Sequence, residues 1–152
     1  MNADEYSDSD RLALDKVISR IQPIQKEGMC TDVETIVNEM LNAQKPLMNL
    51  DVHDICDFFQ GDGAISLFEI AVDDTTDHRM DLALEKIKNE MNHYNTFERL
   101  LVFFYVPQEF PLLIKELQTL TKWIESFQNA PDVLWGISFS QESSFRMVMM
   151  GE

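Results

Sequence analysis

The stretch Leu100-Leu101-Val102-Phe103-Phe104-Tyr105-Val106 decides the fold that this sequence can adopt. It is a continuous apolar run of strand length that ends at Pro107, and such a run is typical of a β-strand buried on both faces. Strands of that kind lie in the middle of a sheet, because their backbone groups and both of their faces need neighbours. The sequence therefore predicts a central strand over residues 100–106.

Other strands are expected on either side of this run along the chain. Residues 64–72 carry apolar side chains at alternate positions and form the first strand. Residues 133–139 and 145–150 form two more, and the polar segment 140–144 connects them. We expect this last pair to form a hairpin.

Apolar residues recur at helical spacing in the remaining segments, which cover about residues 14–21, 33–41, 55–59, 80–91 and 113–127. The order is thus three helices, then strand, helix, strand, helix, strand, strand. This order predicts an α/β (α+β) fold with a four-stranded mixed sheet, two covering helices and a helical N-terminal segment. We divide the chain into an acidic arm with a short helix (1–30) and a main domain (31–152).

Composition narrows the class of partner. The chain has 152 residues, which suits one core, and its 27 acidic and 12 basic residues give a formal net charge of -15. Such a surface repels phosphate backbones and anionic lipid, so we expect neither nucleic-acid binding nor direct membrane binding. The two cysteines, Cys30 and Cys56, lack a paired-ligand spacing. We expect a cytoplasmic protein with no metal site and no cofactor.

The stretch Pro46-Leu47-Met48-Asn49-Leu50-Asp51-Val52-His53-Asp54 is the candidate functional motif, an Asn-x-Asp-x-x-Asp run before a short helix. Asp51 suits the N-cap of that helix and Asp54 its first turn, where free amides and the helix dipole favour acidic residues. Asn49 suits a turn. Two aspartates at this spacing can also hold and polarise a water molecule, so the residues leave capping and chemistry both open.

With these elements in place, residues from about 31 to 151 resemble the carboxy-terminal half of the tubulin and FtsZ superfamily, and FtsZ in particular. The resemblance rests on segments that occur in the same order in both sequences. The run over residues 46–54 is similar to the family's synergy loop, and Gly61-Asp62-Gly63-Ala64 is similar to the turn into its second domain. The start of the family's next helix resembles His78-Arg79-Met80-Asp81-Leu82-Ala83, and its last two strands resemble Leu134-Trp135-Gly136 and Val148-Met149-Met150-Gly151.

The resemblance implies a second domain without the family's GTPase domain. The sequence offers no phosphate-cradling glycine loop, and its longest glycine cluster is Gly61-Asp62-Gly63, so we expect no enzyme activity in cis. In the family, the synergy loop enters the nucleotide site of the next subunit. The resemblance therefore gives Asn49, Asp51 and Asp54 a role in trans, in a module for cell division that docks on or caps an FtsZ or FtsZ-like filament, or that binds itself.

Two other classes of function remain open. Trp123 lies off the apolar stripe of its helix and is a candidate contact residue, which would suit a homo-oligomerisation module unrelated to filaments. An α/β domain of this kind can also be a small-ligand-binding or enzymatic domain, because one fold hosts many functions. A pocket away from the 49–54 loop, lined by convergent polar groups, would favour that alternative.

Overall fold

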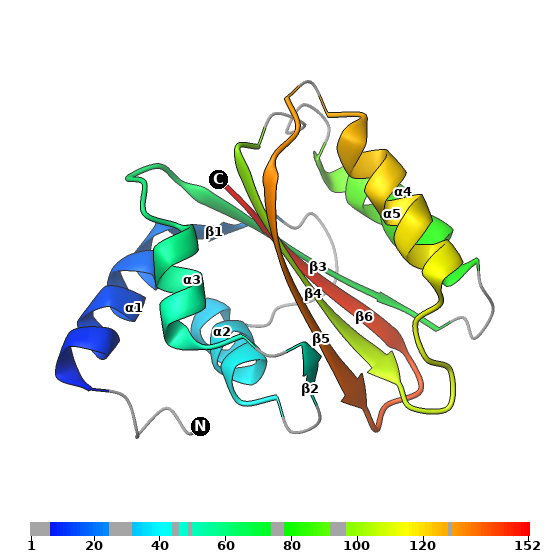
Figure 1. Cartoon of the computed structure of the whole chain (residues 1–152), viewed down its shortest axis with the longest axis horizontal. Helices are drawn as coiled ribbons and strands as arrows, with labels where there is room; N and C mark the ends of the chain where they lie inside the picture. The colour runs from blue at the N-terminus through cyan, green and yellow to red at the C-terminus, as the bar shows by residue number, and fades with distance from the viewer. Residues whose placement is uncertain are drawn as a thin grey trace.

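The computed structural model of the chain describes residues 7–24, 32–43, 46–48, 50–73, 78–91, 97–127 and 129–152. The helices are α1 (Asp8–Arg20), α2 (Val33–Leu41), α3 (Val52–Phe58), α4 (Arg79–Met91) and α5 (Ile114–Glu125). The strands are β1 (Ile21–Pro23), β2 (Pro46–Met48), β3 (Ile65–Val72), β4 (Arg99–Pro107), β5 (Asp132–Ser140) and β6 (Phe145–Gly151). The α/β class and the mixed sheet predicted from the sequence are confirmed (Figure 1).

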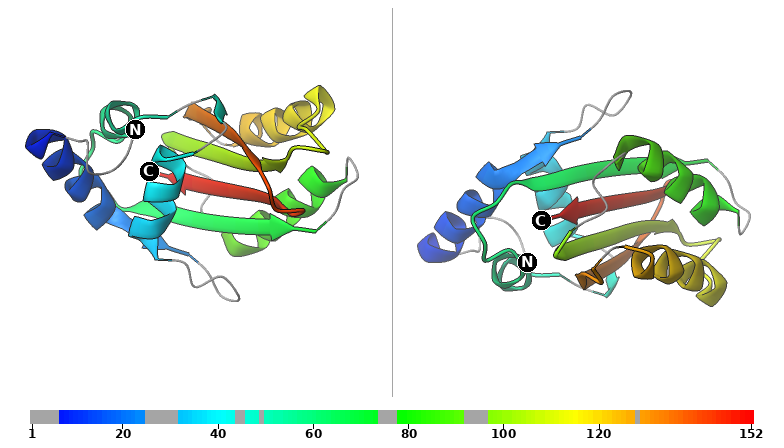
Figure 2. Two further views of the ribbon diagram at one scale, coloured as in Figure 1. Left: turned by 90° about the horizontal axis from the view of Figure 1, so that it is seen from below. Right: turned by 90° about the horizontal axis from the view of Figure 1, so that it is seen from above.

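The strands form one sheet in the order β1-β3-β6-β4-β5-β2. β6 runs antiparallel to both β3 and β4, whereas β5 runs parallel to β4. Figure 2 shows β6 lying between β3 and β4. The predicted hairpin of the last two strands is therefore wrong, because β4 separates β5 from β6. The physical reason is burial: Phe145, Met147 and Met149 are 0% exposed, and so apolar a strand gains more in the middle of the sheet than at its edge.

In the described part of the chain, the sheet has six strands, where the sequence predicts four. The two additional strands, β1 and β2, have three residues each and lie at the two edges. β1 pairs in parallel with β3, with Ile21 opposite Ile65, and β2 pairs antiparallel with β5. Strands of this length are too short to show an alternating pattern. Their prolines, Pro23 and Pro46, lack a backbone N–H and suit edge positions.

Helices cover both faces of the sheet, and β4 supplies the core on each side. Leu100, Val102 and Phe104 pack in the cluster under α4 and α5, while Leu101 and Phe103 pack in the cluster under α1, α2 and α3. All five side chains are 0% exposed, which confirms the predicted central strand. Figure 1 shows the sheet passing between the two groups of helices. Among the described residues, no helix is long and apolar enough to cross a membrane.

α1 packs on the rest of the chain through one apolar side and one arginine. Leu14 and Val17 are buried in the same cluster as α2 and α3. Arg20 donates from Nε to the carbonyl of Gly63 (2.8 Å) and from Nη1 to the carbonyl of Phe59 (2.6 Å), and its Nη2 pairs with Glu152 Oε1 (2.5 Å). These contacts tie α1 to the turn before β3 and to the residue after β6.

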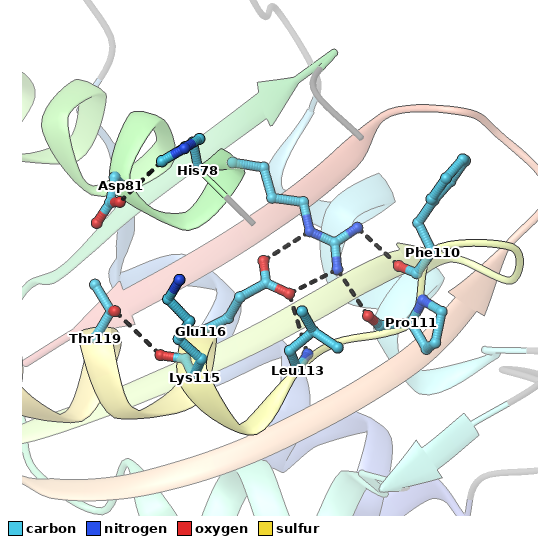
Figure 3. A network of polar contacts seen from close by, with 9 residues as sticks. His78, Asp81, Phe110, Pro111, Leu113, Lys115, Glu116 and Thr119 are labelled. Carbon is cyan, nitrogen blue, oxygen red and sulfur yellow. Dashed lines mark hydrogen bonds and ion pairs between the residues drawn. The ribbon is translucent and has the colours of Figure 1, made fainter. Parts of the chain in front are cut away.

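A buried ion pair holds the two helices of the other face together. Arg79, the first residue of α4, donates from Nε to Glu116 Oε2 (2.7 Å) and from Nη2 to Glu116 Oε1 (2.9 Å). The same guanidinium donates to the carbonyls of Phe110 (2.7 Å) and Pro111 (3.0 Å). Figure 3 shows Glu116 and the two carbonyls converging on it from α5 and from the segment before α5. Arg79 therefore fixes the connection between β4 and α5.

Candidate functional site

The start of α3 carries the two aspartates of the motif in a reciprocal capping arrangement. The backbone N–H of Asp54 donates to Asp51 Oδ1 (2.9 Å), and the backbone N–H of Asp51 donates to Asp54 Oδ2 (3.0 Å). Asp51 is the N-cap residue in extended conformation, and Asp54 is the third helical residue. This arrangement satisfies two amides that the first turn leaves without partners. The predicted capping role of Asp51 is confirmed.

Buried neighbours fix the position of this exposed carboxylate pair. Leu50 and Val52, which flank Asp51, are 2% and 3% exposed and anchor the backbone on both sides of it. Leu50 lies against Gly136 of β5, where a Cβ atom would come within 3.0 Å of its Cδ1 atom. Asp51 and Asp54 themselves are exposed. Asn49 lies outside the described residues, so its predicted role stays a prediction.

The carboxylates keep capacity beyond the cap. The reciprocal bonds use one oxygen of Asp51 and one of Asp54, which leaves a second oxygen on each side chain. His53 lies between the two aspartates in the sequence, and its Nε2 atom lies 3.4 Å from Asp10 Oδ2 of α1. A pair of exposed carboxylates held by a rigid helix start can orient a water molecule or a cation that a partner presents. For the two aspartates to catalyse a reaction within this chain, a substrate site would have to lie beside them.

The neighbouring thiol of Cys56 is not activated. Burial raises the pKa of this thiol above its usual range, and the carboxylates of Asp57 and Asp10 raise it further. A nucleophilic cysteine has the opposite environment, in which nearby cations favour the thiolate. In the described part of the chain, no group of three histidine, cysteine or acidic side chains is arranged to hold a metal ion.

Trp123, the other predicted contact residue, is remote from the aspartates in the fold. It lies on α5, which covers the face of the sheet opposite to α3. Its ring is partly buried and packs edge-on against Phe127, with 4.9 Å between the ring centroids. The structure thus brings Asp51 and Asp54 together and leaves Trp123 on another surface.

The structure also reveals a cavity of about 700 Å³ between α2 and the strands β4, β5 and β6. Its wall on the helix side comes from α2 and the residues just after it, and its wall on the sheet side from β5, β6 and their connection. The lining residues are Thr35, Asn38, Glu39, Asn42, Ala43, Tyr105, Ser138, Phe139, Ser140, Gln141, Glu142 and Arg146. Most of these side chains are polar.

Arg146 is the central charged group of this cavity. It donates from Nε (3.0 Å) and Nη2 (2.5 Å) to Glu69 Oε2 and from Nη1 to Glu39 Oε2 (2.7 Å). Its guanidinium lies 4.6 Å from the ring centroid of Tyr105, which is its direct partner in the β4–β6 register. Burial lowers the pKa of Arg146, but the hydrogen bonds that it donates to Glu39 and Glu69, together with their negative charges, outweigh burial and raise the pKa above its ordinary value. The arginine therefore stays charged.

Tyr105 completes this group. Burial is the main reason that the pKa of its phenol is raised; Arg146 opposes the shift, and Glu39 and Glu69 add to it. The hydroxyl is buried and has no hydrogen-bond partner among the described residues. Sequence reasoning missed the whole cavity, although a signal existed: Glu69 and Arg146 are charged residues inside otherwise apolar strands. Charges at such positions are found paired, and one member of this pair, Arg146, lines the cavity.

Solved structures of FtsZ, TubZ and CetZ are similar to this fold. An FtsZ dimer from M. jannaschii is similar over 91% of this chain and 43% of its own, with a TM-score of 0.53 and 15% identity. TubZ in GDP-form protofilaments, from Bacillus thuringiensis serovar israelensis, is similar over 78% of this chain and 34% of its own, with a TM-score of 0.64 and 10% identity. CetZ from Methanosaeta thermophila has a TM-score of 0.53 at 18% identity and coverage of 78% and 34%.

The fold is therefore that of a tubulin/FtsZ-like C-terminal domain, which confirms the resemblance at the level of structure. The chain spans between 34% and 43% of the length of these solved structures. No protein-family model matches the sequence, and no curated protein matches it.

Proposed function

We propose that the chain is a non-enzymatic assembly or regulatory module that docks on a filament of the FtsZ type through the start of α3. In this proposal, Asn49, Asp51 and Asp54 approach a nucleotide held by the partner, and the two carboxylates can position a water molecule there. The observation that carries the proposal is the exposed, rigidly held carboxylate pair on a tubulin/FtsZ-like fold. Exposed carboxylates of this kind can reach a ligand that is bound to another subunit.

The solved structures with the same fold support an assembly role. One of them is an FtsZ dimer, and another is TubZ in protofilaments. Because their sequence identity to this chain is low, they support the fold of the module, and its partner has to be identified by experiment.

The glycine-containing turn before β3 agrees with a role in trans. Gly61 and Gly63 precede the strand β3, so their backbone amides do not form the start of a helix. Phosphate groups are held most readily by amides at a helix N-terminus. In this proposal, the nucleotide comes from the partner.

Charge sets the conditions under which docking is seen. The chain carries a formal net charge of -15, and the resemblance implies a partner that is also acidic. Repulsion between two acidic proteins weakens as salt shortens the range of their fields. We expect binding to strengthen as the salt concentration rises, whereas contacts between opposite charges would weaken.

The test is co-sedimentation with the FtsZ of the same organism, together with its rate of GTP hydrolysis. We expect the chain to enter the pellet and to change the rate of hydrolysis. The double variant Asp51→Asn, Asp54→Asn keeps oxygen acceptors for the cap but removes two negative charges, so it should bind and leave the rate at its basal value. Glu85→Gln with Glu125→Gln, two exposed carboxylates on α4 and α5, removes the same charge and should behave as wild type.

No change in sedimentation or hydrolysis at stoichiometric excess would disprove the docking proposal. Association of the chain with itself is the alternative that uses the same fold. Light scattering of the isolated chain distinguishes the two, since self-association raises its mass in solution without FtsZ.

A further inference from the structure

The cavity between α2 and the sheet is separate from the start of α3, because Asp51 and Asp54 are not among its lining residues. We propose that this cavity binds a small linear diamine or polyamine, with one ammonium group at Glu39 and a second at Glu142. This inference goes beyond the docking proposal and stands or falls independently of it.

Glu39 is the acidic group with capacity to spare. Glu69, only 2% exposed, already accepts two hydrogen bonds from Arg146 and neutralises it. Glu39 adds a single bond through Oε2, and its other oxygen accepts no hydrogen bond from any described residue. Its side chain is 39% exposed and lines the cavity. Two carboxylates around one guanidinium leave this wall with a net negative charge.

Glu142, which also lines the cavity, supplies the second anchor. It lies in the connection between β5 and β6, whereas Glu39 lies on α2. The backbone N–H of Glu142 donates to Ser140 Oγ (3.0 Å), which fixes the backbone that carries this carboxylate. Two acidic side chains that line one cavity from different elements match a ligand with a cation at each end, and an ammonium group donates up to three hydrogen bonds to such oxygens.

The remaining lining suits the same ligand. The side chain of Asn42 donates from Nδ2 to the carbonyl of Asn38 (2.8 Å), which leaves the amide oxygen of Asn42 as an acceptor. The hydroxyl of Ser138 donates to the carbonyl of Phe139 (3.2 Å) and keeps its own lone pairs. Both groups can therefore accept a hydrogen bond from an ammonium group. A volume of about 700 Å³ holds a small molecule, and the acidic surface of the protein attracts cations and repels anions.

The experiment is isothermal titration calorimetry of the whole chain with putrescine and spermidine, with butylamine as the matched monoamine at equal ionic strength. We expect both polyamines to bind one site and butylamine to bind at least about tenfold more weakly, because it satisfies only one carboxylate. Equal affinity for putrescine and butylamine would overturn the proposal.

Variants separate a site from the general attraction of an acidic protein for cations. Glu39→Gln and Glu142→Gln should each weaken putrescine by about tenfold, while Glu85→Gln on α4, with the same change in charge, should alter it by less than about twofold. Thr35→Trp, at an exposed position on the rim, should block binding without any change in charge. If Glu39→Gln fails to fold, the affinities of Glu142→Gln and Thr35→Trp for putrescine still test the site. Wild-type affinity in both of these, or equal losses in Glu85→Gln, would refute the site.

Discussion

Arg79 and Glu116 form a two-bonded ion pair that joins the first residue of α4 to the first turn of α5, and their side chains are 2% and 1% exposed. Removing one partner leaves the other charge buried. Arg79→Met should lower the free energy of unfolding by about 3–5 kcal/mol, measured by urea denaturation. The exposed Arg11→Met is the control and should change stability by less than about 0.5 kcal/mol. Similar small losses in both variants would show that the pair is not desolvated.

The capping hydrogen bonds at the start of α3 should contribute measurably to the free energy of unfolding. Asp51→Ala should lower the free energy of unfolding by about 1 kcal/mol, and Asp51→Asn, which keeps an acceptor for the Asp54 amide, should be close to wild type. Because the two bonds belong to one reciprocal arrangement, the loss in the Asp51→Ala, Asp54→Ala double variant should be less than the sum of the single losses. Additive losses in a thermal or urea denaturation series would contradict this coupling.

Tyr105 should make the chain sensitive to alkaline pH. The folded state raises the pKa of its phenol, so the proton is held more tightly in the folded than in the unfolded chain. The stabilisation is fully present below the ordinary tyrosine pKa of about 10 and is lost as the pH rises above it. Urea denaturation at increasing alkaline pH should show a steeper loss for wild type than for Tyr105→Phe.

The same variant tests the environment of the hydroxyl at neutral pH. Because the Tyr105 hydroxyl has no hydrogen-bond partner among the described residues, Tyr105→Phe should be as stable as wild type or more stable. A loss of more than about 1 kcal/mol would show that the hydroxyl makes a hydrogen bond in the folded protein.

Gly136 should not tolerate a side chain. A Cβ atom at this position would overlap the ring of Phe103, which is 0% exposed and has no room to move away, and would approach Leu50. Gly136→Ala should lower the free energy of unfolding by about 1–3 kcal/mol. Gly63→Ala, whose added Cβ would meet its nearest neighbour at 3.9 Å, is the control for the glycine change itself and should be milder. Equal losses would show that the Phe103 ring adapts.

The sequence was informative where burial is strong and local. The run over residues 100–106 identified the central strand because all the members from Leu100 to Phe104 are buried, on alternating faces. Asp51 was predicted as a cap because its bonds reach only as far as Asp54. Patterns of this kind depend on neighbours in the sequence, so the sequence alone can reveal them.

Features set by distant partners escaped prediction. The position of β6 depends on pairing with β3 and β4, more than thirty residues away; its apolar pattern favours burial but does not identify the strands on either side of it. The cavity has the same origin: Glu39 and Arg146, which line it, come from α2 and β6, and Glu69, which binds Arg146, comes from β3. The charges inside β3 and β6 were visible, but only the register shows that they meet.

The position of β6 has a consequence during synthesis. In the described sheet, β1 with β3 and β4 with β5 and β2 form two halves that hydrogen-bond to each other only through β6. β6 also leaves the ribosome after all of the other strands. Until then, the nascent chain exposes the backbone edges of β3 and β4, two largely apolar strands. Strands of other chains can pair with these edges. We expect the growing polypeptide to depend on chaperones until this strand is inserted.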